Sequence, residues 1–316
     1  MPAKKVVLST GPGAPDLILT NSSITTWLSC HRKFKLQYED LISLKAIATP
    51  LVIGSIVHEG LADLLQGKGL EHATAHVRTL IKKARAGILE DPEGFEDDAV
   101  IIEGMIRGWD KNRGHLKDAK PWVWQDKTWV EQVFEVKMSG GEVITGKIDG
   151  VVTLPDGIWV VEHKTAGRVD SAYINRLAVD AQVSMYSWAI WKLLGEKPKG
   201  TIYNVLGKPG IRQKKTESPA QFQERLLTEL TSDPKYFFST MLYRDDQQLQ
   251  DFDKNLQHII DDVRRERDRK AWVPNTSQCS MIGRTCNMLP ICASGMKPEV
   301  MALYDKRKAL HPELSS

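Results

Sequence analysis

Long apolar runs are missing from this chain of 316 residues, and no stretch is long and apolar enough to span a membrane. Residues 1–20 lack the apolar core of a secretory signal, so we expect a tail or edge segment there and a cytoplasmic protein. The net charge is only +3, which excludes a protein that is strongly basic over its whole surface. A cleft that concentrates positive charge remains compatible with this balance.

Cysteine is also scarce, with Cys30 near the start of the chain and Cys279, Cys286 and Cys292 near its end. This grouping, without a secretory signal, argues against a disulfide framework. Four thiolates suit either a Zn²⁺ site or an iron–sulfur cluster. The C-x-x-C pairs that are typical of zinc sites are absent. Four buried free cysteines are the remaining alternative.

A β-hairpin is predicted for GKIDGVVTLPDGIWVVEHKT, residues 146–165, where two apolar, β-branched runs flank Pro-Asp-Gly. We expect Asp156 and Gly157 to be the two turn residues, which makes Asp149 face Lys164. Because strand side chains alternate between faces, Asp149, Glu162 and Lys164 then share one face of the sheet.

Two carboxylates on one face form an oxygen site of the kind that Mg²⁺ or Mn²⁺ prefers. A lysine beside such a metal can orient a water molecule and stabilise developing negative charge. The alternative is a cross-strand salt bridge on a solvated face. The runs IDGVV and IWVV are apolar on both faces, which instead indicates a covered strand.

The order of Asp149, a turn and Glu162-x-Lys164 resembles the PD-(D/E)XK nuclease motif, and its form here is similar to the RecB-like branch. The resemblance implies an α/β fold with a restriction-endonuclease-like core. It would have a central mixed β-sheet flanked by helices, a helical insertion and a cysteine-stapled terminal region. It also implies that Asp149, Glu162 and the backbone carbonyl of His163 bind the metal, and that Lys164 is catalytic.

Further motifs follow the order of the same family. Gln182 and Tyr186 lie four apart on an apolar, helix-periodic segment and so share one face. They resemble the family's Q-x-x-x-Y motif, which implies a role in DNA binding. His58 resembles the histidine that reaches the metal site, although a lone helical histidine is more often structural. The family often has an additional acid on the preceding strand, and both Glu131 and Glu135 are candidates, with Glu131 matching the usual phrasing better.

The cysteines resemble the [4Fe–4S] staple of AddB-type, CRISPR-associated and phage exonucleases, in which the first cysteine follows a short N-terminal helix and the last three close the domain from its far end. The gap between Cys279 and Cys286 is longer here than in AddB-type domains, whereas the gap to Cys292 matches. A Zn²⁺ site remains the alternative.

Basic side chains are concentrated in KPGIRQKK, where Lys208 and Arg212 could contact phosphates, although a solvated loop explains them equally well. The cluster RRERDRK at residues 264–270 is interpreted as a mixed-charge, exposed helix face.

We expect one nuclease domain over residues 21–300, followed by a C-terminal tail over residues 301–316. Within it the parts are a helical insertion at about 60–120, a catalytic core at about 121–210, and helices with the cysteine cluster at about 218–295.

Together these features predict a metal-dependent DNase, most simply an exonuclease on single-stranded DNA in a bacterial or phage-infected cell. Its partners would be proteins of replication, repair or recombination. One alternative is a non-catalytic DNA-binding or recombination accessory module, which the intact set of Asp149, Glu162 and Lys164 disfavours. A metal-dependent phosphatase or RNase is the other.

Overall fold

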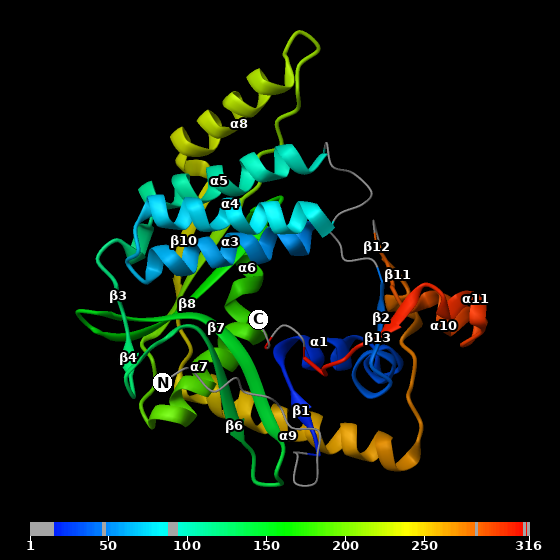
Figure 1. Ribbon diagram of the computed structural model, residues 1–316. Helices are drawn as coiled ribbons and strands as arrows, with labels where there is room; N and C mark the ends of the chain where they lie inside the picture. Colours follow the sequence, from blue (N-terminus) through cyan, green and yellow to red (C-terminus); the bar gives the residue numbers. More distant parts are fainter. Residues whose placement is uncertain (1–15, 46–48, 88–93, 282–283, 312–313, 315–316) are drawn as a thin grey trace. The chain divides into compact units, whose positions relative to one another are not determined.

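The computed structural model describes residues 16–45, 49–87, 94–281, 284–311 and 314 (Figure 1). The chain divides into two compact units. Unit 1 is drawn from Met1–Ile47, Val133–Lys147 and Gln247–Ser316, and unit 2 from Ala48–Gln132 and Ile148–Asp246. Among the described residues, no helix has the length and apolar character needed to cross a membrane.

Unit 2 begins with three consecutive helices, continues with a run of strands, and ends with helices placed between its last strands. Its helices are α3 (Thr49–Leu65), α4 (Leu70–Gly87), α5 (Gly94–Lys111), α6 (Ser171–Arg176), α7 (Ala181–Leu194) and α8 (Pro219–Ser232). Its strands are β3 (Lys120–Pro121), β4 (Val123–Trp124), β5 (Lys127–Thr128), β8 (Gly157–Ala166), β9 (Gly200–Gly207) and β10 (Phe237–Leu242). Strands β6 (Val130–Lys137) and β7 (Val143–Leu154) contribute residues to both units.

The sheet is mixed, as predicted. Its strand order is β1-β7-β8-β9-β10, and β3 and β6 also pair with β7. The pairs β7–β8 and β9–β10 are antiparallel, whereas β8 and β9 run parallel.

Helices cover both faces of the sheet in unit 2. Along β9, Ile202 and Leu206 join a core with α3, α4 and α5, which pack side by side (Figure 1). Tyr203 and Val205 pack from the opposite face against Val183 of α7. One strand supplies both cores because its side chains alternate between faces. The predicted α/β fold with helices flanking a central mixed sheet is confirmed.

The hairpin of β7 and β8 forms with a different turn from the one predicted. Leu154 pairs with Gly157, so the two turn residues are Pro155 and Asp156. Proline has φ fixed near the value that the first position of a common turn requires. Gly157 takes a φ of 137° inside the ladder, a conformation that favours glycine. The expected turn at Asp156 and Gly157 was therefore wrong. Each residue of β7 faces a β8 residue two positions earlier than expected, and because a shift of two keeps a side chain on its face, the predicted faces are unchanged.

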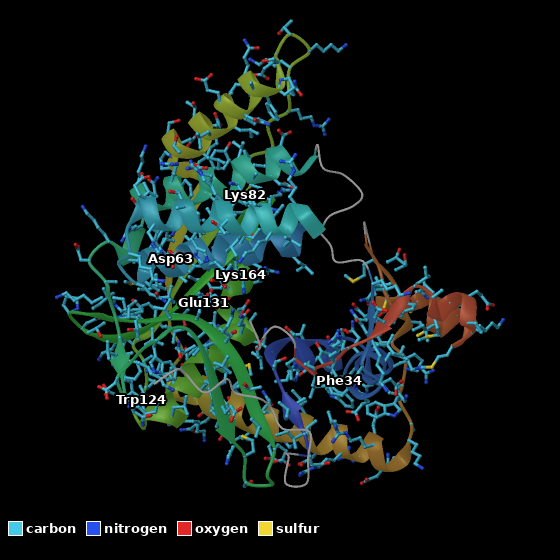
Figure 2. All side chains as sticks on the ribbon, viewed as in Figure 1. Phe34, Asp63, Lys82, Trp124, Glu131 and Lys164 are labelled. Carbon is cyan, nitrogen blue, oxygen red and sulfur yellow. The ribbon has the colours of Figure 1, made fainter. Side chains whose placement is uncertain are left out.

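The connection between α3 and α4 is held by Asp63, which is labelled in Figure 2. Its buried carboxylate accepts hydrogen bonds from Lys68 Nζ and His76 Nδ1, both at 2.7 Å. His72 Nε2 lies 3.6 Å from the same carboxylate. Burial would raise the pKa of Asp63, but the contacts with Lys68 and His76 hold it below its usual value.

Unit 1 combines the two ends of the described chain. Its elements are β1 (Ile18–Leu19), α1 (Asn21–Ser29), α2 (His31–Phe34), β2 (Ile42–Leu44), α9 (Asp246–Arg269, from its second residue), β11 (Ser280–Met281), β12 (Arg284–Thr285), α10 (Leu289–Ser294), α11 (Pro298–Met301) and β13 (Tyr304–Lys306). Strand β1 pairs in parallel with the start of β7, and β13 pairs antiparallel with β2. The expected C-terminal tail thus includes a paired strand, and residues 1–15 of the expected N-terminal tail lie outside the described residues.

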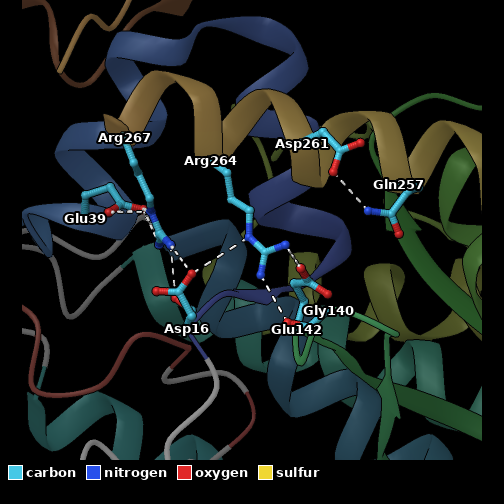
Figure 3. Close-up of polar contacts among 8 residues, drawn as sticks. All are labelled: Asp16, Glu39, Gly140, Glu142, Gln257, Asp261, Arg264 and Arg267. Carbon is cyan, nitrogen blue, oxygen red and sulfur yellow. Dashed lines mark hydrogen bonds and ion pairs between the residues drawn. The ribbon is translucent and has the colours of Figure 1, made fainter. Parts of the chain in front are cut away.

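Helix α9 is fixed by two arginines that the sequence analysis assigned to an exposed face (Figure 3). Arg264 forms an ion pair with the fully buried Glu142 and donates to the carbonyl of Gly140 at 3.1 Å. Arg267 donates three hydrogen bonds to Glu39, the shortest at 2.8 Å. A buried carboxylate is costly unless a cation neutralises it, so Arg264 holds α9 to the β6–β7 turn, and Arg267 holds it to the segment that follows α2. The exposed-face interpretation is wrong for these two residues.

Candidate active site

Strands β7 and β8 bring together three residues that the sequence predicts to be catalytic. Oδ2 of Asp149 accepts a hydrogen bond from the backbone N–H of His163 at 2.7 Å. On β8, the Nζ atom of Lys164 forms an ion pair with Glu162. Asp149 and Glu162 are only 7 % and 1 % exposed, so each carboxylate requires a positive partner.

Helix α3 and strand β6 add two more side chains. The Nδ1 atom of His58 lies 3.2 Å from Oδ1 of Asp149. One ligand atom each from His58, Glu131 and Asp149 lie within 4.8 Å of one another. Within the described ranges, no other set of three or more His, Cys, Asp or Glu ligand atoms is so compact. Glu162 lies outside this set of three.

Glu131 occupies an unusual backbone conformation. Its φ is 53°, in the left-handed region that non-glycine residues rarely adopt. Such a conformation inside a strand costs about 1–3 kcal/mol and re-aims the side chain. Of the two candidate acids, Glu131 is the one whose oxygen approaches His58 and Asp149, and its role stays a prediction.

At His58 and Asp149, neighbouring charges shift the pKa in the direction opposite to the effect of burial. Burial alone would lower the pKa of His58, but the Asp149 carboxylate, aided by Glu131 and Glu162, raises it to about 9. Burial would raise the pKa of Asp149, but His58 holds it well below its usual range. A cation bound by these side chains would replace the proton on His58 as the source of positive charge beside Asp149.

The second acid and the lysine form a tightly coupled pair. Burial, reinforced by Asp149 and opposed by Lys164, raises the pKa of Glu162 to about 7. Burial would lower the pKa of Lys164, but the carboxylates of Glu162 and Asp149 raise it above its usual value. Lys164 is therefore a protonated cation at neutral pH, suited to donating hydrogen bonds and stabilising negative charge.

Helix α7 positions this lysine through the predicted Q-x-x-x-Y pair. Gln182 Oε1 accepts a hydrogen bond from Lys164 Nζ at 3.0 Å, and Gln182 Nε2 donates to Tyr186 Oη at 2.9 Å. Asp180, which the sequence analysis missed, is the N-cap of α7 and accepts from the backbone N–H groups of Gln182 and Val183. The available signal was an aspartate directly before an apolar helical run.

The side chain of His163 points away from the acids, as predicted for its place between Glu162 and Lys164. Its ring is 2 % exposed and lies edge-on to Trp109, with ring centroids 5.3 Å apart. Burial lowers the pKa of His163 to about 4, so the ring is neutral. Its backbone stays beside Asp149.

The two basic residues predicted to contact phosphates lie after β9. The backbone N–H of Lys208 donates to the carbonyl of Ala166 at 2.8 Å. Arg212 is exposed, and its carbonyl accepts a hydrogen bond from Arg225. A role of Lys208 and Arg212 in DNA binding remains a prediction.

The four cysteines gather in unit 1. Burial raises the pKa of Cys292, and the other three cysteines raise it further. The backbone N–H of Cys286 donates to the carbonyl of Cys279, and the backbone N–H of Asn275 donates to Sγ of Cys30 at 3.3 Å. No three of these sulfurs lie within 4.8 Å of one another among the described residues. Four thiolates suit either Zn²⁺ or an iron–sulfur cluster, and the identity of the group stays a prediction.

The donor set of His58, Glu131 and Asp149 fits a divalent cation. The buried carboxylate of Asp149, the half-buried carboxylate of Glu131 and an imidazole suit Mg²⁺ or Mn²⁺, and the imidazole adds preference for the softer Mn²⁺. With the ammonium of Lys164 near Asp149 and Glu162, the arrangement can activate a water molecule and neutralise a transferring phosphate.

Comparison with known proteins agrees with this chemistry. The family model of the PD-(D/E)XK nuclease superfamily matches residues 18–293. A solved structure of a proposed exonuclease from Eubacterium rectale is similar at 11 % identity and a TM-score of 0.46, covering 88 % of this chain and 93 % of that one. No curated protein matches the chain.

Proposed function

Because this chain belongs to the PD-(D/E)XK nuclease superfamily, we propose that it is a divalent-metal-dependent DNase that hydrolyses single-stranded DNA from its ends. The observation that carries the proposal is the convergence of His58, Glu131 and Asp149 beside the Glu162–Lys164 pair. The preference for single strands and ends rests on the resemblance of the Gln182–Tyr186 pair to the RecB-like branch.

Asp149, Glu131 and His58 would hold the metal, and the backbone carbonyl of His163 and the carboxylate of Glu162 complete the oxygen-rich surroundings. A bound Mg²⁺ or Mn²⁺ would polarise the scissile phosphate and lower the pKa of a water ligand. Lys164 donates hydrogen bonds to the attacking water and to the pentavalent phosphate as its charge grows. Glu162 keeps Lys164 protonated, and Gln182 aims its Nζ atom.

We propose further that Cys30, Cys279, Cys286 and Cys292 hold a [4Fe–4S] cluster with a structural role. Each cysteine would then bind a different iron of the cluster, and the support for it is that the four cysteines influence one another electrostatically within unit 1. The result expected of anaerobically purified protein is a broad absorption band near the visible region that Cys286→Ser removes. Stoichiometric zinc without iron would assign the site to Zn²⁺.

The test of the nuclease uses 5′-labelled and 3′-labelled single-stranded DNA with Mg²⁺ or Mn²⁺. Wild-type protein should release one label first, EDTA should stop the reaction, and Asp149→Ala should be inactive. A matched pair on β6 sharpens the assignment, because Glu131→Gln should lose activity and Glu135→Gln should keep it. DNA binding without cleavage of single strand, duplex or RNA would favour the accessory-module function instead.

A further inference from the structure

A small tryptophan-rich hairpin lies directly before Glu131 in unit 2. Strands β4 and β5 pair Val123 with Thr128 and Trp124 with Lys127. Gln125 and Asp126 form its two-residue turn with φ of 50° and 58°, as a tight hairpin turn requires. The proposed metal site uses no residue of this hairpin.

Three indole rings of the hairpin lie together. Trp122 and Trp124 are stacked, with ring centroids 5.9 Å apart and an interplanar angle of 14°. Trp129 lies 5.6 Å from both rings. Trp129 is buried at 6 % exposure and anchors the group, whereas Trp122 and Trp124 remain partly exposed. The tip of the hairpin carries Trp124, as Figure 2 shows.

The hairpin is tied to the strands that carry the metal ligands. The backbone N–H of Trp122 donates to the carbonyl of Val151, and the N–H of Val151 donates to the carbonyl of Trp129, at 2.8 and 2.7 Å. Val151 lies two residues after Asp149, and Trp129 lies two residues before Glu131. Two residues of strand span about 7 Å, so the backbone of the anchoring Trp129 lies about that far from the backbone of Glu131.

Positive charge accompanies the rings. Lys120 and Lys127 are exposed, and neither makes an ion pair with another described residue. Lys127 lies directly across the ladder from Trp124. Aromatic faces alternating with free cations are the combination that binds a strand of unpaired nucleotides, because bases stack on rings while lysines neutralise phosphates.

We propose that the β4–β5 hairpin is a base-stacking platform on which Trp122 and Trp124 hold unpaired bases of the DNA strand that enters the metal site. This inference rests on the proposed nuclease function and names its substrate more narrowly, as a strand whose bases are free to leave their own stack. Bases of a duplex are already stacked on their neighbours, so the platform discriminates against double-stranded DNA.

Equilibrium binding by the full chain carrying Asp149→Ala tests the platform without cleavage. The ligands are a fluorescein-labelled oligo-dT of about 15 nucleotides and an abasic strand of equal length and charge. Adding Trp124→Leu should weaken binding of oligo-dT about tenfold and leave the abasic strand within about twofold. Trp124→Phe, which keeps an aromatic face, should retain most of the affinity. Lys127→Gln should weaken both strands alike and reduce the salt dependence.

The outcomes separate this inference from the proposed function. Equal affinity of Trp124→Leu and its parent for oligo-dT overturns the platform, and so does an equal loss on oligo-dT and the abasic strand. The nuclease proposal is decided independently by cleavage with the wild-type chain. A wild-type chain that fails to cleave, while Trp124→Leu loses oligo-dT alone, would leave the platform standing and remove the nuclease.

Discussion

The Nζ atom of Lys164 on β8 donates a hydrogen bond to Oε1 of Gln182 on α7, with a length of 3.0 Å. The same ammonium forms an ion pair with Glu162, so its position is set from two elements. Gln182 is held in turn by Tyr186. The Q-x-x-x-Y pair, which the sequence suggested as a DNA contact, therefore positions Lys164, the proposed catalytic lysine.

Replacement of Gln182 should affect the chemical step more than substrate binding. Gln182→Leu removes one of the two contacts that aim Lys164, and a displaced catalytic group costs about 10–100-fold in rate. We expect kcat to fall by that amount while KM for single-stranded DNA changes little. Tyr186→Phe should give a smaller loss of the same kind. A rise in KM with unchanged kcat would instead make Gln182 mainly a DNA contact.

Removal of Lys164 should separate activity from stability. Lys164→Met eliminates cleavage but not DNA binding, and it leaves the buried carboxylate of Glu162 without its partner. We expect a loss of about 1–3 kcal/mol in the free energy of unfolding, measured by urea denaturation. The double variant Lys164→Met/Glu162→Gln should recover most of that stability and remain inactive. A double variant as unstable as the single one would contradict the pairing argument.

Substitution of Glu131, whose backbone is strained, should also change activity and stability independently. Glu131→Gly relieves the positive φ of 53° and should raise the free energy of unfolding by about 1 kcal/mol while removing metal-dependent cleavage. Stability gained at the expense of activity is typical of functional strain. Glu135→Gly on the same strand is the control and should destabilise the protein. Equal effects of the two substitutions on stability would argue against strain at Glu131.

Asp63, at the α3–α4 connection, should make the free energy of unfolding depend on pH. Its folded pKa lies below the unfolded value of about 3.9, so its contribution is complete above that pH and disappears as the pH falls through the folded value. Asp63→Asn should therefore lower the free energy of unfolding by about 1–3 kcal/mol at pH 7. Urea denaturation at a series of pH values should show the difference from wild type shrinking below about pH 4. A constant difference down to acid pH would contradict this account.

Local sequence patterns placed the three central residues of the candidate site together, because strand side chains alternate between the two faces of a sheet. Asp149, Glu162 and Lys164 could be assigned to one face from period two alone, and this assignment survives a misplaced turn. The turn was wrong because Pro155 suits the first turn position better than the familiar Asp-Gly pair. The sequence favoured Glu131 over Glu135 by resemblance alone, and nothing in it indicates the left-handed φ of Glu131.

Other features depend on partners distant in the chain. The charge pattern of residues 264–270 is that of a solvated helix face, yet Glu142, more than a hundred residues away, buries its carboxylate against Arg264. The tryptophan hairpin was missed for another reason. Its signal, a two-residue Gln-Asp turn between W-x-W and K-T-W, lies outside the usual Asn-Gly and Asp-Gly turns.

The division of the chain into units has a consequence for how the molecule is made. Every residue of the proposed catalytic set belongs to unit 2, whose sequence is complete at Asp246, whereas unit 1 requires its first, middle and last segments together. Synthesis proceeds from the amino end, and distant segments pair slowly. The proposed catalytic residues can therefore come together on the ribosome before Cys279, Cys286 and Cys292, which group with Cys30, have been synthesised.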